Sequence, residues 1–279
     1  MRKLFYSASA FALMLCAASC NNNDKSASPT PATMEQTVSI KTENVDYTGD
    51  GVTMKGFAAY NDSLKGPLPV VIIVHEWWGQ TDYPRMRARQ LAELGYLAFA
   101  IDMYGDGKTA ESPDSAQKLS SPFYANLKMS QARFDAALAK IKTLPNADTN
   151  RIAAIGYCFG GGIVLNMARL GESLKGVVSF HGNLLGAPAD KNLLQAEILI
   201  CHGDSDKFVL PAEVAGFKKQ MDSIGAKYTF KSYANATHAF TNPGATEKGI
   251  KYHMPIEYNA AADTASFNEM KMFLSRIFK

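Results

Sequence analysis

Cysteine is scarce in this chain of 279 residues, and neither sign of charge dominates it. The four cysteines, Cys16, Cys20, Cys158 and Cys201, are too few and too scattered for a disulfide scaffold, and no Cys-x-x-Cys pair indicates a zinc site. Lys and Arg number 29 against 26 for Asp and Glu, without a long basic run, which argues against nucleic-acid binding. Hydrophobic residues at 47% and charged residues at 20% are typical of a globular protein rather than a disordered or polytopic membrane protein.

The apolar stretch at 4–18 is about 15 residues long, which is shorter than the roughly 20 residues that a membrane-spanning helix requires. It follows Arg2 and Lys3 and ends in small residues before Cys20, an arrangement typical of an export signal. The small residues followed by Cys resemble a bacterial lipoprotein signal, in which Cys20 becomes the lipidated first residue. An ordinary secretory signal is the alternative interpretation.

These features predict three segments: a lipoprotein-type signal peptide at 1–19, a flexible tether at 20–36, and one folded domain at 37–279. The tether is rich in Asn, Ser, Pro and Thr and lacks apolar periodicity. We therefore expect an exported bacterial lipoprotein that is anchored in a membrane through Cys20 and faces the periplasm or the cell exterior.

Strand-like and helix-like segments alternate along the predicted domain. Two strands, 37–47 and 52–60, are separated by turn residues at 48–51 and predict an N-terminal β-hairpin. The alternation predicts an α/β fold with a mostly parallel central sheet and helices on both faces, which binds ligands beyond the carboxyl ends of its strands. Further strands are expected at 69–75, 96–104, 151–157, 176–180, 197–201 and 228–233, helices at 83–94, 126–144, 160–170, 212–224 and 263–278, and a Gly/Ser/Pro-rich loop at 105–123.

A candidate nucleophile lies between a strand and a helix. Cys158 is flanked two residues away on each side by Gly156 and Gly160, which is the pattern of a nucleophile elbow with Cys in place of Ser. Glycine is required there because side chains would collide with each other or with the neighbouring strand. The start of the following helix also favours the thiolate. The sequence matches neither a P-loop nor a dinucleotide fingerprint; a buried structural Cys158 is the alternative.

A nucleophile elbow requires a histidine base and an acid later in the chain. His238 follows the last predicted strand by five residues, where such a fold supplies its base. Asp204 and Asp206 both follow the strand at 197–201, and either carboxylate could orient the imidazole.

The oxyanion of a reacting carbonyl needs two backbone amides. We expect one from Phe159, directly after the nucleophile, and one near Trp77, after the strand at 69–75. Glu76 is not followed by the second histidine of a zinc helix, so no metal is predicted. Trp77 and Trp78 cannot both point into the core from one turn, so at least one is expected to line a pocket.

Five motifs together resemble the dienelactone hydrolase family of α/β-hydrolases: VVIIVHEWWG at 70–79, AIDMYG at 100–105, GYCFGGG at 156–162, HGDSDKFV at 202–209 and THAF at 237–240. The resemblance covers about 40–279. It implies the α/β-hydrolase fold, a Cys-His-Asp triad of Cys158, His238 and Asp206, and a contact between Glu76 and the resting nucleophile. Candidate substrate-binding residues are Trp78, Tyr104 and Lys108.

The sequence departs from the family at two arginines that hold a substrate carboxylate. No Arg follows Tyr104, where Lys108 is the nearest cation, and Asn242 stands four residues after His238. Lys is a poorer match to a carboxylate than the planar fork of Arg. The departures imply that dienelactone itself is not the substrate.

The sequence therefore predicts a hydrolase of carboxylic ester bonds, related to dienelactone hydrolases and carboxymethylenebutenolidases. It would act on small esters or lactones through a thioester on Cys158, with no metal or organic cofactor, no nucleic acid and no obligate protein partner. The alternatives are a non-catalytic ligand-binding lipoprotein on the same fold, and an acyl transferase or thioesterase that uses the same triad. Cys201 is expected in the core, with a redox partnership with Cys158 as the alternative.

Overall fold

The computed structural model describes residues 39–279. The predicted signal peptide, the tether and the lipidated Cys20 lie outside the described residues. Contacts divide the chain into two units, and the fold described below is that of the second unit, Thr37–Lys279.

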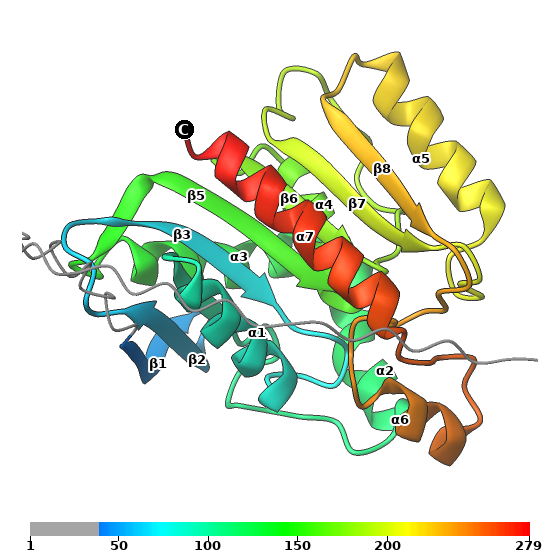
Figure 1. The fold of residues 1–279 in the computed structure, drawn as a ribbon, viewed down its shortest axis with the longest axis horizontal. Helices are drawn as coiled ribbons and strands as arrows, with labels where there is room; N and C mark the ends of the chain where they lie inside the picture. Colours follow the sequence, from blue (N-terminus) through cyan, green and yellow to red (C-terminus); the bar gives the residue numbers. More distant parts are fainter. Residues whose placement is uncertain (1–38) are drawn as a thin grey trace, which may run out of the picture. The chain divides into compact units, whose positions relative to one another are not determined.

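Eight strands form one sheet in the described part of the chain, in the order β1-β2-β4-β3-β5-β6-β7-β8 (Figure 1). The six strands from β3 to β8 are parallel, whereas β2 pairs antiparallel with both β1 and β4. This topology confirms the predicted α/β fold with a mostly parallel sheet and an N-terminal hairpin. The strands are β1 Ile40–Gly49, β2 Val52–Asn61, β3 Leu68–Val74, β4 Leu97–Ile101, β5 Ala147–Tyr157, β6 Gly176–Phe180, β7 Glu197–Gly203 and β8 Tyr228–Tyr233.

The hairpin turns within the predicted segment. Asp50 and Gly51 have φ values of 52° and 70°, and two successive left-handed residues are what a tight two-residue hairpin turn requires. Because β2 is antiparallel to both of its neighbours, β1 runs in the same direction as the parallel strands. Ile40 therefore begins β1 at the amino edge of the sheet.

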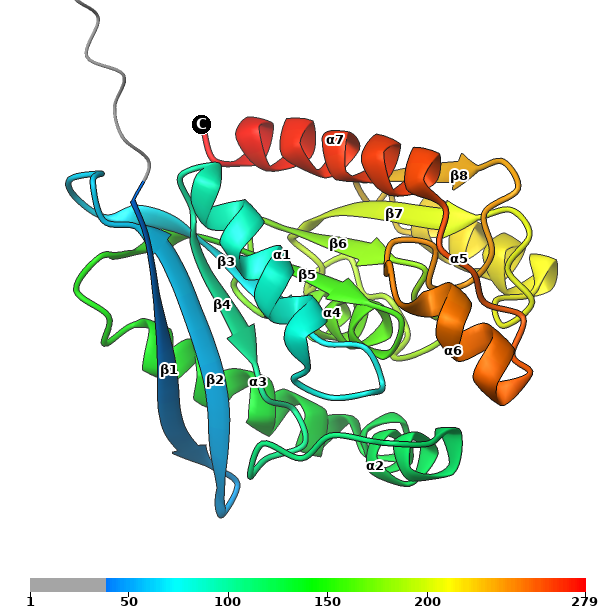
Figure 2. The same cartoon turned by 60° about the horizontal axis from the view of Figure 1, so that its bottom comes forward.

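Helices cover both faces of the sheet, as predicted, but the described residues contain seven helices, two more than the five expected (Figure 2). Buried side chains of α1 and α7 belong to one hydrophobic cluster, and those of α3, α4 and α5 belong to a second cluster on the opposite face. The helices are α1 Asp82–Glu93, α2 Pro113–Ala125, α3 Leu127–Ile141, α4 Phe159–Arg169, α5 Pro211–Ser223, α6 Ala245–Tyr252 and α7 Ala260–Ile277.

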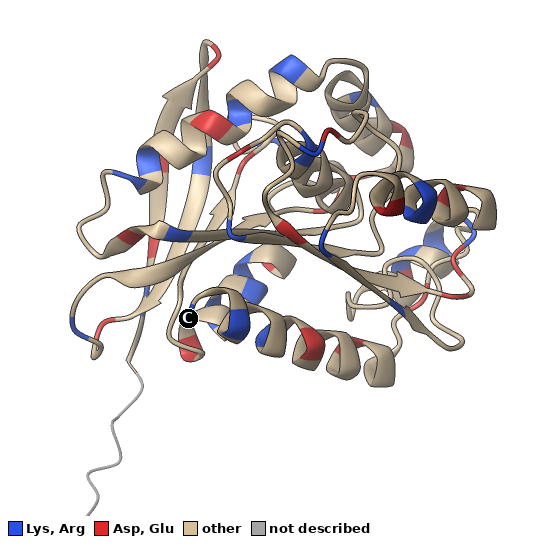
Figure 3. Ribbon diagram, turned by 90° about the horizontal axis from the view of Figure 1, so that it is seen from above, with Lys and Arg blue, Asp and Glu red and all other residues tan. Residues whose placement is uncertain are grey.

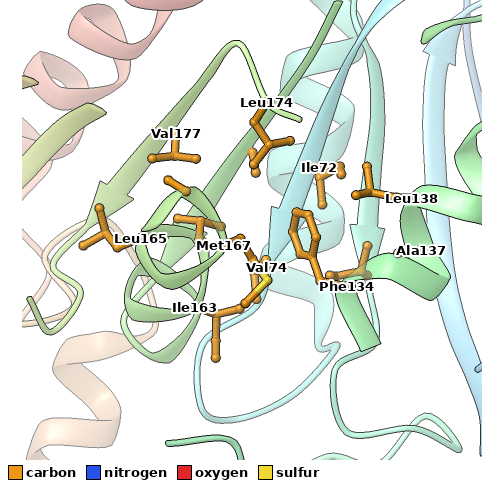
Figure 4. Packing of buried hydrophobic residues seen from close by; sticks show 14 of the residues in the cluster. Ile72, Val74, Phe134, Ala137, Leu138, Ile163, Leu165, Met167, Leu174 and Val177 are labelled. Carbon is orange, nitrogen blue, oxygen red and sulfur yellow. The ribbon is translucent and has the colours of Figure 1, made fainter. Parts of the chain in front are cut away.

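Strand β3 separates the two clusters and contributes to both. Its side chains alternate, so that Ile72 and Val74 pack with the second cluster while Ile73 packs with the first. Figure 4 shows Ile72 and Val74 beside Phe134 of α3 and Ile163 of α4. Burial of each such side chain stabilises the fold by about 1.5–3 kcal/mol, so the strand that carries the site is well fixed.

Helix α2 was not predicted, because 105–123 has the composition of a loop. Its start nevertheless has clear local signals. The Ser112 hydroxyl accepts a hydrogen bond from the Ser115 amide at 3.3 Å, and Pro113 occupies the first turn. Helix α3 begins one residue later than expected because Asn126 caps it, accepting from the Met129 amide at 3.2 Å.

Within residues 39–279, we find no helix whose length and apolar character would allow it to cross a membrane. The same residues contain no cluster of three or more His, Cys, Asp or Glu side chains suited to a metal ion. Figure 3 shows Lys and Arg interspersed with Asp and Glu along the helices.

Candidate active site

The predicted site residues follow four parallel strands of the sheet. Glu76 follows β3, Cys158 follows β5, Asp206 follows β7 and His238 follows β8. In Figure 2 the arrowheads of β5, β6 and β7 point toward the side of the molecule where α6 lies. Parallel strands end at one edge, so the topology gathers these side chains where α/β proteins bind ligands.

Cys158 occupies a strained turn between β5 and α4. Its φ of 53° and ψ of −113° are uncommon for a residue other than glycine. A Cβ on Gly156 would lie 2.0 Å from the carbonyl oxygen of Gly160, and a Cβ on Gly160 would lie 2.2 Å from that of Val74. The predicted steric need for glycine on both sides of Cys158 is therefore confirmed.

The imidazole of His238 lies between Cys158 and Asp206. His238 Nδ1 and Asp206 Oδ2 are 2.9 Å apart, and the Cys158 side chain is close enough to the same imidazole to raise its pKa. Asp206 Oδ1 accepts from the amides of Phe208 at 2.7 Å and Val209 at 3.2 Å, which fixes the carboxylate.

The exposed Asp204 has a different set of partners from Asp206. Its Oδ1 accepts hydrogen bonds from the Asn235 amide at 2.8 Å and from the Ser205 hydroxyl at 3.0 Å. The geometry thus places Asp206, and not Asp204, at the imidazole of His238.

Electrostatics favour a protonated imidazole at His238. Burial alone would lower the pKa of His238, but the charge of Cys158 and the hydrogen bond with Asp206 outweigh it and raise that pKa well above its ordinary value. Burial would raise the pKa of Asp206, but the hydrogen bond and the charge of His238 lower it overall. His238 is therefore suited to hold and release a proton beside the thiol.

Glu76 lies in the same cavity as Cys158, with its carboxyl group buried. Asn242 Nδ2 donates a hydrogen bond to Glu76 Oε2 at 2.6 Å. Burial raises the pKa of Glu76, although Lys248 and the Asn242 amide act in the opposite direction. Asn242, which stands where the family has its second arginine, therefore binds the carboxyl group of Glu76.

The two expected oxyanion donors, Phe159 and Trp77, belong to segments that meet next to Cys158. Phe159 is the first residue of α4, so its amide has no carbonyl partner one helical turn earlier. Trp77 lies in the turn after β3, which is tied to the elbow because the Gly160 amide donates to the His75 carbonyl at 3.1 Å. Backbone amides at these positions suit the stabilisation of a developing oxyanion.

An apolar cavity of about 220 Å³ opens beside Cys158. Trp77 and Trp78 both contact it, as the adjacent tryptophans suggested. Several other lining residues were missed because they come from loops and from α2, without a recognisable motif. The cavity is lined by Glu76, Trp77, Trp78, Tyr124, Cys158, Asn183, Phe208, Val209, His238, Ala239, Met254 and Ile256.

Two predicted substrate-binding residues are not among those that line this cavity. Tyr104 is buried behind it, and its hydroxyl donates to the Trp77 carbonyl at 2.9 Å. The Lys108 ammonium is 53% exposed and pairs with Asp106 at 3.0 Å. Tyr104 therefore supports the turn after β3, and Lys108 pairs with Asp106 instead of lining the cavity.

Cys201 is buried in the core, as expected, and both Cys158 and Cys201 are free thiols. Burial raises the pKa of the Cys201 thiol to about 12, although a hydrogen bond from Tyr233 opposes the shift. A thiol that is almost wholly protonated at neutral pH is a poor nucleophile. Of the two free thiols in the described residues, only Cys158 lines the cavity.

The sheet order, the strained elbow and the loop positions of His238 and Asp206 are those of an α/β hydrolase. The chain belongs to the dienelactone hydrolase family, whose model matches residues 54–278. Membership of this family indicates a hydrolase that acts on ester or lactone bonds and confirms the predicted resemblance.

Individual relatives agree with this assignment. A protein of Escherichia coli strain K12, whose name gives it provisionally as a carboxymethylenebutenolidase, is 30% identical over 230 residues, which cover 77% of this chain and 83% of the relative. Protein usf of Aquifex pyrophilus is 29% identical over 204 residues, or 71% of this chain and 86% of the relative. Among solved structures, a dienelactone hydrolase-like promiscuous phosphotriesterase from metagenomic libraries is 32% identical with a TM-score of 0.81, over 86% of this chain and 99% of the other.

Proposed function

We propose that the protein is a Cys-dependent hydrolase of small, uncharged carboxylic esters or lactones. The observation that carries this proposal is the grouping of Cys158, His238 and Asp206 beside an apolar cavity, with His238 hydrogen-bonded to Asp206 and raised in pKa by Cys158. A nucleophile, a base and an acid that orients the base are the parts that acyl transfer requires.

In the first half of the reaction, the Cys158 thiolate attacks the carbonyl carbon of the ester. The amides of Phe159 and Trp77 stabilise the oxyanion that forms. The C–O bond then breaks, and His238 gives its proton to the leaving alkoxide, so that an alcohol and a thioester result. Glu76, held by Asn242, is suited to help move the thiol proton toward His238.

In the second half, His238 removes a proton from water, and the resulting hydroxide attacks the thioester. The tetrahedral intermediate expels the Cys158 thiolate and leaves a carboxylic acid, while the proton on His238 restores the starting ion pair. Asp206 keeps the imidazole oriented throughout. An alcohol in place of water would make the same intermediate an acyl donor, which is the transferase alternative.

The decisive experiment is a panel of p-nitrophenyl esters, lactones and thioesters, with wild-type protein and Cys158→Ala. The panel includes a p-nitrophenyl phosphotriester, because a structurally similar relative is named a phosphotriesterase. We expect ester turnover by the wild type and at least about a 10³-fold loss in the variant. Equal inactivity of both proteins on every substrate would favour the non-catalytic binding protein.

Charge in the cavity sets the expected substrate class. Of the described residues that line it, Glu76 is the carboxylic acid, and none is a Lys or an Arg. A substrate carboxylate would enter an apolar site without a Lys or Arg partner and beside the carboxyl group of Glu76, which costs free energy. We therefore expect neutral acyl groups to be preferred.

A matched pair of substrates tests this preference: p-nitrophenyl valerate and mono-p-nitrophenyl glutarate, which differ chiefly in a terminal carboxylate. We expect kcat/KM to favour valerate by at least about 10-fold, equivalent to about 1.4 kcal/mol. Glu76→Gln should narrow the ratio, whatever its effect on the absolute rates. Equal kcat/KM values for the two substrates would show that the cavity does not discriminate against a carboxylate.

We also propose that the protein is an exported lipoprotein anchored through Cys20, a proposal supported by the sequence of the first 20 residues. Fractionation of cells that express the full chain tests it. Wild-type protein should sediment with membranes, and Cys20→Ala should move to the soluble fraction. Intact-mass measurement should find lipid on the wild-type protein and none on the variant.

A further inference from the structure

His181 is a strained, buried histidine that the proposed mechanism does not use. It follows β6 directly, and its φ of 41° lies in the left-handed region although it is not glycine. Its side chain is among the buried polar groups, with 1% exposure. Strain at a buried polar residue beside an active site points to a function that the surrounding structure maintains.

Both ring nitrogens of His181 have partners. The Cys158 amide donates to His181 Nδ1 at 3.1 Å and is shared with the Phe180 carbonyl at 3.0 Å. His181 Nε2 and the Thr241 hydroxyl oxygen are 2.7 Å apart. Because Nδ1 accepts, the proton of the neutral ring must lie on Nε2, which donates to Thr241.

Thr241 belongs to the loop that carries the proposed base, three residues after His238. The Thr241 and Tyr83 hydroxyl groups are 2.6 Å apart, so α1 also holds this loop. Arg87 donates to the Thr241 carbonyl at 2.7 Å and to the Tyr83 hydroxyl at 3.3 Å. Thr241 is thus fixed from two sides.

The same series of hydrogen bonds joins two strained segments. Cys158 has a φ of 53°, and Ala239, next to His238, has a φ of 61°. The rings of His181 and His238 also touch edge to face, with centroids 5.4 Å apart. His181 therefore contacts the nucleophile turn through one nitrogen, the base loop through the other, and the base through its ring.

We propose that His181 is a positioning residue that holds the nucleophile turn and the base loop at the spacing needed for proton transfer between Cys158 and His238. The inference rests on the proposed function, because it assumes that this pair performs the chemistry. A misplacement of about 1 Å in a catalytic pair can cost up to about 10²-fold in rate.

Thr241→Val tests the proposal by removing the hydroxyl while keeping the shape of the side chain. We expect kcat on p-nitrophenyl valerate to fall about 10-fold or more, with KM within about twofold, because geometry rather than binding changes. The pH profile of iodoacetamide alkylation of Cys158 should also shift. Thr241→Ser, which restores the hydroxyl, should recover both readouts.

His181 variants separate the two nitrogens. His181→Asn keeps an acceptor near Nδ1, whereas His181→Gln keeps a donor near Nε2, and each should lose part of the rate. Residues that act through one contact have non-additive effects. The kcat of the double variant His181→Asn with Thr241→Val should therefore lie within about twofold of the kcat of the slower single variant.

Ser130→Ala is the control for the loss of a buried hydrogen bond elsewhere, because the Ser130 hydroxyl donates to the Phe123 carbonyl at 2.7 Å within the α2–α3 region. It should lower Tm and leave kcat and the alkylation profile unchanged. If Thr241→Val behaves in the same way, His181 has only a structural role and the proposal is overturned. If Thr241→Val does not fold, the kcat and the alkylation profile of Tyr83→Phe and His181→Asn test the proposal instead.

The alkylation series separates this proposal from the proposed function. Absence of ester turnover in wild-type protein would refute the hydrolase, but the pH profile of alkylation would still report the Cys158–His238 spacing. An alkylation profile that is unchanged in Thr241→Val, His181→Asn and Tyr83→Phe would refute the positioning role, even in an active esterase.

Discussion

At the scale of single residues, two glycines differ in whether the structure has room for a side chain. A Cβ on Gly160 would lie 2.2 Å from the Val74 carbonyl oxygen, which is backbone and cannot rotate away, whereas a Cβ on Gly216 in α5 would meet no atom within 4 Å. We expect Gly160→Ala to lower the free energy of unfolding by about 3 kcal/mol or more. Gly216→Ala should raise it by about 0.5–1 kcal/mol. Urea unfolding measures both, and a Gly160→Ala variant as stable as wild type would contradict the close approach.

Buried histidines make stability depend on pH. Burial, together with the charges of His238 and Arg87, lowers the pKa of His181 well below its ordinary value of 6.5. Below about pH 6.5 the unfolded chain therefore binds a proton that folded His181 does not, and stability falls as the pH falls.

Comparison of wild type with His181→Asn isolates this contribution. Over pH 6.5 to 5, the wild-type free energy of unfolding should fall more steeply than that of the variant, by up to about 1.4 kcal/mol per pH unit. Above about pH 7.5 the difference should no longer change with pH. Parallel stability curves for the two proteins between pH 5 and 6.5 would contradict a neutral His181.

Part of the site could be predicted at this scale. Cys158 and Phe159 follow from the glycine spacing, and His238 from its place after the last strand. Spacing alone left Asp204 and Asp206 open, because two carboxylates share one loop. The family resemblance implied Asp206, and the fold shows that this carboxylate meets the imidazole. His181 has no sequence signature, since its partners come from two other segments, the turn at Cys158 and the loop that carries His238 and Thr241.

At the scale of elements, α2 depends on its first turn. Ser112 accepts a hydrogen bond from the Ser115 amide, and Ser115 in turn caps the Ser112 amide. Ser112→Ala should lower the free energy of unfolding by about 1 kcal/mol. Ser121 is an exposed residue of the same helix, and its hydroxyl donates to the Gln117 carbonyl one turn earlier. Ser121→Ala should change the free energy of unfolding by less than about 0.5 kcal/mol. Equal effects in chemical denaturation would argue against the cap.

The same helix shows why element prediction failed at 105–123. Gly, Ser and Pro dominate that stretch and weaken apolar periodicity, although Ser112 and Pro113 are good residues for a helix start. The central strands were easier. The run at 70–74 is β-branched throughout and buried on both faces, so composition and environment agree.

At the scale of the whole molecule, one sheet serves two hydrophobic clusters. Ile72 and Ile73 are adjacent and wholly buried, but they face opposite clusters. Ile72→Val and Ile73→Val should each cost about 0.5–1.5 kcal/mol, and the double variant should cost their sum because the side chains do not touch. Urea unfolding of the four proteins tests this. A strongly non-additive double variant would mean that the two layers repack together.

The direction of β1 has a practical consequence. The described chain begins at the amino edge of the sheet, whereas the cavity opens beyond the carboxyl edge. A support attached at the start of β1 would hold the domain at the edge of the sheet opposite the cavity. Substrate would then arrive by free diffusion from solution rather than along the supporting surface, and a bead or electrode coated in this way should retain turnover.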